Sequence, residues 1–250
     1  MGRRAGLIAG CVLALGAVAL GVAFFAHRTQ ETRTTIVLRV VSPPPPPPPV
    51  LRAVHEFGAR VPRGRRLTLR TKPGGRVLTT VDSRTEFGSP ETFSVAYVKG
   101  PWLAVRSTAL GNTRLGWVRA RRVQLLNRTL TLDVDLSRRE LIVRDPGVQR
   151  RIPVAIGAPD TPTPPGTFYV TDKLRGADFG SYYGCCILAL SGHQPNLPQG
   201  WSGGDRLAIH GSPTPTWGLA VSNGCLHAAE PDLRYLMKTV PLGTAVRIHA

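Results

Sequence analysis

The sequence predicts a mainly β protein: a small β-barrel, then a larger β-sandwich domain with a short C-terminal helix, all behind an N-terminal membrane helix. Three patterns predict this architecture. Residues 56–126 alternate short β-branched and aromatic stretches with Gly and Pro, as small barrels do. Residues 130–136 alternate strictly between apolar and polar side chains, which is typical of a half-buried strand. Residues 5–26 are almost entirely apolar.

The N-terminus predicts a membrane anchor. Arg3 and Arg4 lie in a basic end, residues 1–4, that we expect on the cytoplasmic side. As a helix, residues 5–26 are long enough to cross a hydrocarbon core of about 30 Å. The apolar region of a signal peptide is normally shorter, so an uncleaved signal-anchor is favoured, with cleavage after Ala23 and secretion as the alternative. In both cases the remainder of the chain lies outside the cytoplasm.

A linker is predicted over residues 27–50. Its first part is polar and unpatterned, and it ends in seven consecutive prolines, Pro43–Pro49. Polyproline II rises about 3.1 Å per residue, so the prolines form a semi-rigid spacer of roughly 20 Å. We expect this spacer to hold the following domains away from the membrane.

Residues 51–126 form the first predicted β domain. Strands are expected at residues 67–70, 77–81, 93–98, 102–105 and 116–118. Three elements, Leu-Arg-Thr-Lys-Pro-Gly-Gly from Leu69, Trp-Leu-Ala-Val from Trp102, and Gly-Trp-Val from Gly116, make this segment similar to a bacterial SH3-like domain. The resemblance implies either wall binding or a spacer role.

The positive charge of the chain is concentrated in the same segment. Residues 51–126 hold fifteen Arg or Lys and four acids, a net +11 out of +17 for the whole chain. No helix-turn-helix, zinc-finger or RNA-binding aromatic pattern accompanies this charge, so nucleic acid is not an expected partner. An anionic surface outside the cell is expected instead, either phospholipid headgroups or phosphate-bearing wall polymers.

A thiol and an imidazole form the sharpest chemical signal. An apolar run ends in His210-Gly211, and Ser222-Asn223-Gly224-Cys225 follows after a loop. A thiol with a pKa of about 8.5 needs a neighbouring base to act as a nucleophile at neutral pH, and His210 can supply one. Asn and Gly tolerate a tight turn, which can aim successive backbone N–H groups at one point and so form an oxyanion hole.

Further motifs place this pair in a domain over residues 127–250. Thr163-Pro-Pro-Gly166 precedes a strand, residues 230–240 show helical spacing behind Pro231, and Gly-Thr-Ala-Val-Arg-Ile from Gly243 predicts a last strand. Together with the His-Gly and Ser-Asn-Gly-Cys segments, these motifs resemble the L,D-transpeptidase catalytic domain of the YkuD family. The resemblance covers roughly residues 129–250.

The resemblance implies roles in remodelling bacterial peptidoglycan stem peptides. Cys225 would be the nucleophile, His210 its base, and the carbonyl of Gly211 the group that orients the imidazole. The N–H groups of Gly224 and Cys225 would hold the oxyanion, with Ser222 and Asn223 shaping the turn. A second stem's amine as acceptor would give a 3→3 cross-link, and water would make the protein an L,D-carboxypeptidase. A non-catalytic wall-binding protein is the alternative from another class.

Four other side chains are candidates for substrate contact. Trp217 lies in the loop after His210, and Tyr182 and Tyr183 precede the cysteine pair; each could line a groove or simply pack. His227 stands where many members of the family have Arg, which puts in doubt any carboxylate contact at that position.

No cofactor or metal site is expected, because His210 and Cys225 must be free for catalysis and paired Cys/His spacing is missing. The adjacent Cys185 and Cys186 are expected to be strand residues on opposite faces, with no disulfide framework. The implied location is the bacterial cell envelope.

Overall fold

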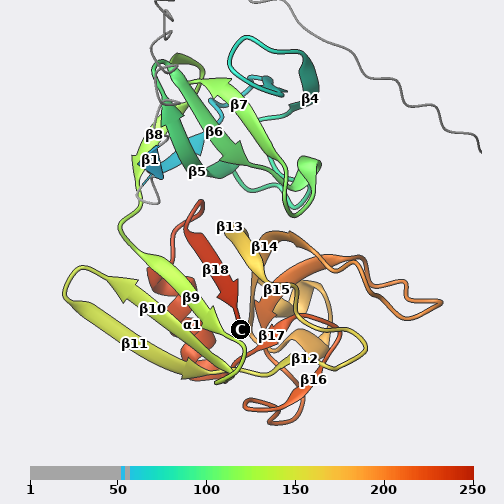
Figure 1. The fold of residues 1–250 in the computed structure, drawn as a ribbon. Coiled ribbons are helices and arrows are strands. Elements are labelled where there is room, and N and C mark those ends of the chain that lie inside the picture. The colour runs from blue at the N-terminus through green and yellow to red at the C-terminus, as the bar shows by residue number, and fades with distance from the viewer. Residues whose placement is uncertain (1–51, 54–56) are drawn as a thin grey trace, which may run out of the picture. The chain divides into compact units, whose positions relative to one another are not determined.

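The computed structural model describes residues 52–53 and 57–250. The predicted membrane segment at 5–26 and the Pro-rich linker at 27–50 lie outside the described residues. Among the residues that are described, no helix is both long and apolar enough to cross a membrane. The fold is mainly β, as predicted, and its strands form two large sheets and one small one (Figure 1).

The N-terminal sheet is antiparallel and covers the basic segment. Its strand order is β4-β3-β7-β6-β5-β2-β8, and β1 also pairs with β5. The strands are β1 (Arg52–Ala53), β2 (Phe57–Arg60), β3 (Leu67–Arg70), β4 (Val77–Val81), β5 (Thr92–Lys99), β6 (Trp102–Arg106), β7 (Leu115–Arg119) and β8 (Gln124–Asn127). All five strands predicted here form, each with its bounds shifted by at most two residues. The SH3-like assignment stays a prediction.

Strand alternation separates a core face from a charged face in this sheet. On β3, Leu67 and Leu69 are buried in an apolar cluster with Phe93 and Val95 of β5. Because side chains alternate along a strand, Thr68 and Arg70 of β3 point away from the cluster. The second face of the sheet is thereby left to polar and charged side chains.

The C-terminal sheet is a single curled sheet rather than the two facing sheets expected of a sandwich. Its order is β11-β10-β9-β18-β13-β14-β15-β17, and β12 and β16 pair separately. The strands are β9 (Thr131–Asp135), β10 (Glu140–Asp145), β11 (Val148–Pro153), β12 (Ile156–Gly157), β13 (Gly166–Arg175), β14 (Cys186–His193), β15 (Arg206–His210), β16 (Ala220–Ser222), β17 (Leu226–His227) and β18 (Ala245–His249). The half-buried strand predicted at 130–136 is β9, and the predicted last strand is β18.

One helix, α1 (Glu230–Thr239), packs against β14 and closes the core of this sheet (Figure 1). Pro231 lies in its first turn with two acids, where a missing N–H costs nothing and negative charge favours the helix dipole. Leu233 and Leu236 are fully buried on its inner face. The helix forms where the sequence predicts it.

Polar and aromatic contacts join the strands of the two sheets within the unit from Pro48 to Ala250. The buried Tyr169 of β13 belongs to the apolar cluster of the N-terminal sheet, with its ring 6.4 Å from that of Phe93. Thr85 donates to the buried Asp172 at 2.5 Å, and Arg206 forms an ion pair with Glu86. The domain boundary predicted between residues 126 and 127 stays a prediction.

A buried carboxyl lies at this junction. Glu91 is 7% exposed, and its pKa is raised to about 7, chiefly by burial and next by the nearby negative charge of Asp172. The Tyr169 hydroxyl is 3.5 Å from the Glu91 carboxyl. The junction therefore holds Glu91 in its protonated form over much of the acidic pH range.

Candidate active site

The parallel pairing of two strands brings the predicted nucleophile next to the strand that carries the predicted base. In the pairing of β15 with β17, Ile209 lies opposite Leu226 and His210 opposite His227. Ile209 and Leu226 are buried in the apolar core. Since side chains alternate along a strand, His210 and His227 share the other face, with their ring centroids 4.6 Å apart. Cys225 directly precedes β17, and its sulfur contacts the backbone of β15.

His210 is oriented by the carbonyl of the next residue, as the sequence analysis expects. Its Nδ1 lies 2.6 Å from the Gly211 oxygen, and a carbonyl only accepts, so Nδ1 carries the hydrogen. In the neutral ring, Nε2 is then unprotonated and can take up a proton. His210 is 2% exposed, and its pKa is lowered to about 4, first by burial and second by His227.

Cys225 is a free, half-buried thiol. Its sulfur lies 3.9 Å from the Arg206 carbonyl, at the start of β15. Burial raises the pKa of the thiol to about 11, and a hydrogen bond with the Ala208 backbone offsets part of this rise. At neutral pH the resting site is therefore a neutral thiol beside a neutral imidazole, and the sulfur contacts the β15 backbone.

The turn before Cys225 is held by the Ser222 hydroxyl. Ser222 Oγ donates to the Cys225 carbonyl at 2.6 Å and accepts the Gly224 N–H at 3.1 Å. Gly224 has φ +105°, a conformation that favours glycine. The Gly224 N–H, expected at an oxyanion hole, is thus bonded to Ser222 in this structure.

Three side chains outside the turn hold it through hydrogen bonds to its backbone carbonyls. The buried Gln194 amide lies 3.0–3.2 Å from the carbonyls of Thr161, Pro162 and Asn223. Thr161 and Thr163 donate through their hydroxyls to the carbonyls of Ser222 and Gly224, respectively, at 2.9 Å. Sequence reasoning missed Gln194, whereas Thr163 lies in a motif that it had already singled out.

Aromatic rings surround the two imidazoles. The His210 ring centroid is 4.6 Å from that of His227 and 4.9 Å from that of Tyr183, and Tyr182 lies within 6.1 Å of both histidines. Trp217 is 41% exposed, and the described residues give it no ring contact with this cluster. The structure therefore brings both tyrosines to the base, and Trp217 stays a predicted substrate contact.

His227 is buried beside the base rather than exposed to substrate. It is 2% exposed, its Nδ1 lies 3.1 Å from the Thr216 hydroxyl, and burial lowers its pKa. Neutral pH therefore leaves this imidazole uncharged. His227 therefore supplies no fixed positive charge at the position where the family resemblance suggests an Arg.

A pocket of about 590 Å³ extends from the site. Tyr183 and Ala208 line it on the side of His210 and Cys225, and Phe179, Phe87 and Glu86 line it further out. The rings of Phe87 and Phe179 are 5.9 Å apart, and those of Phe179 and Tyr183 are 6.4 Å apart. The pocket can therefore receive an extended chain of mixed polarity along β15, the strand that ends at His210.

The cysteine pair departs from the expectation. Cys185 and Cys186 are joined by a disulfide, so the prediction that they lie on opposite faces of a strand is wrong. Only Cys186 belongs to β14, because Gly184, with φ +67°, turns the chain just before Cys185. Strand alternation therefore does not apply to the pair.

No group of three or more His, Cys, Asp or Glu within residues 52–53 and 57–250 is placed to hold a metal ion. The chemistry available at this site is that of a thiol, an imidazole and backbone N–H groups. These are the groups that acyl transfer through a thioester requires.

Comparison with known proteins agrees with the geometry. The YkuD family, described as the L,D-transpeptidase catalytic domain, matches residues 130–248. The YkuD protein of Bacillus subtilis (strain 168) is 34% identical over 105 residues, which are 41% of this chain and 54% of that protein. This chain thus spans about half the length of that relative.

Two solved structures are similar at lower identity. L,D-transpeptidase 3 from Mycobacterium tuberculosis is 18% identical, with 54% of this chain and 74% of that chain covered and a TM-score of 0.39. The catalytic domain of the E. faecium L,D-transpeptidase, solved after acylation by ertapenem, is 24% identical, with 49% and 98% covered and a TM-score of 0.35. Residues 130–248 of this chain thus match the L,D-transpeptidase catalytic domain of the YkuD family, and the Bacillus relative is similar to this chain over 105 residues.

Proposed function

We propose that this protein forms 3→3 cross-links between peptidoglycan stem peptides, with Cys225 as the nucleophile and His210 as its base. One observation carries the proposal. The hydrogen bond from His210 Nδ1 to the Gly211 carbonyl leaves Nε2 free to accept a proton, and the Cys225 sulfur contacts the backbone of β15, the strand that ends at His210.

Both steps can use the same imidazole. The Cys225 thiol gives its proton to His210 Nε2 as the sulfur attacks the carbonyl of the third stem residue. The tetrahedral intermediate then breaks its C–N bond, and the terminal D-Ala leaves with that proton on its amine, so a thioester remains. The side-chain amine of a second stem attacks the thioester, gives a proton to His210, and the Cys225 thiol is restored when the C–S bond breaks.

The backbone around Cys225 stabilises the oxyanion in this scheme. We assign the first donor to the Cys225 N–H. The Gly224 N–H contributes by exchanging its present partner, the Ser222 hydroxyl, for the developing negative charge. Ser222 keeps its second bond, to the Cys225 carbonyl, and so holds the turn during the exchange.

The pocket beside the site suits a peptide donor. Its aromatic side, at Phe179 and Tyr183, can cover the aliphatic part of a stem, and the ion pair of Glu86 with Arg206 makes another part of its wall polar. Peptidoglycan peptides are the substrates that the family implies, and they lie outside the cytoplasm. We accordingly place the catalytic domain in the cell envelope, anchored through residues 5–26, with residues 51–126 as an SH3-like module on an anionic envelope polymer.

The test is intact mass spectrometry of the full chain after incubation with meropenem, a carbapenem that acylates active thiols of this family. We expect one covalent adduct on the parent, none on Cys225→Ala, and slower formation on His210→Gln. An adduct that persists in Cys225→Ala would refute the assignment of the nucleophile. A folded parent that forms no adduct would favour a non-catalytic wall-binding protein.

A second assay separates the two acceptors. Incubation with a tetrapeptide stem releases D-Ala in either reaction, but only a transpeptidase yields a cross-linked dimer. D-Ala release without dimer, with a second stem present in excess, would identify an L,D-carboxypeptidase instead.

A further inference from the structure

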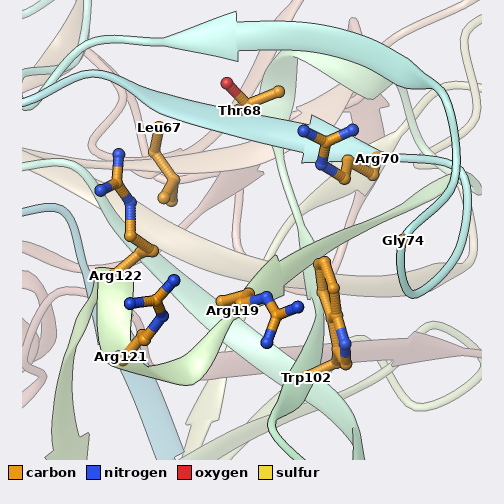
Figure 2. Close-up of a pocket in the computed structure, with 8 residues that line it drawn as sticks. All are labelled: Leu67, Thr68, Arg70, Gly74, Trp102, Arg119, Arg121 and Arg122. Atoms are coloured by element: carbon orange, nitrogen blue, oxygen red, sulfur yellow. The ribbon is translucent and has the colours of Figure 1, made fainter.

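The N-terminal sheet carries a second hollow, of about 410 Å³, that the catalytic proposal does not use. Strands β3, β6 and β7 and the 3₁₀ turn that follows β7 (Ala120–Arg122) contribute its walls. Figure 2 shows four guanidinium groups around a common space, with one indole beside them. We call this hollow the arginine pocket; its lining residues are Leu67, Thr68, Arg70, Gly74, Trp102, Arg119, Arg121 and Arg122.

Strand register builds the arginine pocket. Trp102 of β6 and Arg119 of β7 are direct cross-strand partners, and the Arg119 guanidinium lies 4.7 Å from the indole centroid (Figure 2). Arg70 enters from β3, where its guanidinium is held by the Gly75 carbonyl at 2.9 Å. Arg121 and Arg122 follow from the turn, so two strands and a turn direct their cations to one place, beside the indole from β6.

These cations lack carboxylate partners. Among the described residues, none of the four pocket arginines forms an ion pair, and no acid lines the pocket. Three arginines of the C-terminal sheet do form ion pairs. Arg144, Arg150 and Arg151 pair with Asp133, Asp232 and Glu140, respectively. Four like charges around one hollow repel each other, and a bound anion relieves that repulsion.

We propose that the arginine pocket binds a polyol phosphate polymer, that is, a chain of phosphodiesters without bases. Guanidinium groups are planar forks that match phosphate oxygens in pairs, and four of them suit successive phosphates rather than a single small anion. The proposal rests on the proposed function, because the envelope location is what would bring the protein into contact with such a polymer. The proposal goes beyond that function by assigning the contact with the wall polymer to the arginine pocket. Binding there would hold the enzyme on the polymer.

Two other polyanions fit the pocket less well. A nucleic acid would need exposed aromatic faces on which bases can stack, and the one indole in the pocket is half-buried and lies under Arg119. A membrane surface favours a flat basic face with exposed aromatic side chains, whereas these cations surround a hollow. Both become outcomes of the test.

The test measures the affinity of the full chain for a short poly(glycerol phosphate) by isothermal titration calorimetry at 50 and 200 mM salt. Four guanidinium–phosphate contacts predict a logarithmic salt slope of roughly 3, so this rise in salt weakens binding about fiftyfold. The variant Arg119→Gln/Arg121→Gln/Arg122→Gln keeps one contact. We expect it to bind about a hundredfold more weakly at 50 mM salt and to lose only about threefold between the two salt concentrations.

The matched control removes three exposed charges elsewhere on the same domain, Arg63→Gln/Arg65→Gln/Arg114→Gln. It has the same net charge as the pocket variant and should bind within about threefold of the parent. The milder pair Arg121→Gln/Arg122→Gln leaves the stacked Arg119 in place and should bind about twentyfold more weakly, so a folding defect in the triple variant cannot decide the result.

Equal losses in the pocket and control variants would overturn the proposal, because the contact would then be net charge alone. Tighter binding to phosphatidylglycerol vesicles or to single-stranded DNA than to the polymer, with the same dependence on the pocket, would replace the proposed ligand. Binding is measured without turnover, so an inactive Cys225 in the meropenem assay leaves this result standing.

Discussion

Alanine at Gly224 should disrupt the catalytic turn in a way that depends on Gln194. A Cβ at this position would lie well inside van der Waals contact with Gln194 Nε2, and φ is +105°. The backbone conformation alone costs a non-glycine residue about 2 kcal/mol. Displacing the Gln194 amide breaks at least two of its hydrogen bonds, which costs about 2 kcal/mol more. We therefore expect Gly224→Ala to lower the free energy of unfolding by about 4 kcal/mol.

A double-mutant cycle isolates the contact. Gln194→Ala alone loses the same hydrogen bonds and should cost about 2 kcal/mol. In the double variant those bonds are lost only once, so its cost should be about 4 rather than about 6 kcal/mol, a coupling of about 2 kcal/mol. The assay is urea unfolding of all four proteins, with the rate of meropenem acylation as a second readout, which should fall in Gly224→Ala as Cys225 moves.

Gly147→Ala is the matched control. Gly147 also has a positive φ, +77°, but a Cβ there meets no atom within 4 Å. It should cost only about 1–2 kcal/mol and leave acylation unchanged. Additive costs in the cycle, or a Gly224→Ala variant no less stable than this control, would refute the role given to Gln194.

Three further predictions concern titration and the disulfide. The pKa of His210 is lowered to about 4 and that of Cys225 is raised to about 11. The rate of meropenem acylation should therefore stay level from pH 5 to pH 10 and fall near pH 4. A fall near pH 6.5 would contradict a buried neutral base. The pKa of Glu91 is about 7 in the folded protein and near 4.5 in the unfolded chain, so the folded state binds this proton more tightly. Its contribution to stability is therefore present below pH 4.5 and is lost as the pH rises to 7. Urea unfolding should therefore show Glu91→Gln gaining up to about 3 kcal/mol on the parent between pH 4.5 and pH 8, and an equal difference at both pH values would exclude this. The variant Cys185→Ser/Cys186→Ser removes the disulfide and should slow acylation about fivefold. The reason is that it loosens the neighbouring segment, in which the Tyr183 carbonyl accepts the Gly211 N–H at 2.9 Å. Dithiothreitol should slow acylation of the parent equally and leave the variant unchanged.

Local patterns were sufficient for several elements and for proposing the central pair. The alternation at 130–136 became β9, and the spacing behind Pro231 became α1, because both depend on neighbours in sequence. His210 and Cys225 could be chosen from residue chemistry and their motifs. The contact of the Cys225 sulfur with β15 follows from the parallel pairing of β15 with β17, which no local pattern specifies.

Long-range contacts account for what sequence reasoning did not reach. Gln194 lies 29 positions before Asn223 and belongs to no motif, yet its amide contacts three carbonyls around the turn. The basic excess of residues 51–126 was visible in the sequence. The sequence did not show that four of these arginines surround one hollow, because that arrangement depends on the cross-strand register of Trp102 with Arg119.

The neutral resting pair decides how the first proton must move. An ion pair of thiolate and imidazolium would need a pKa order opposite to that of this site, where burial raises the pKa of Cys225 and lowers that of His210. His227 adds no fixed charge that could stabilise a thiolate, since it is itself buried with a lowered pKa. In the reaction we propose, the thiol therefore loses its proton to His210 as the sulfur attacks, when the acyl carbonyl and its oxyanion donors stabilise the developing charge. Burial of His210 and Cys225 disfavours separated charges before attack, so in this reaction activation of the thiol accompanies the attack on the substrate.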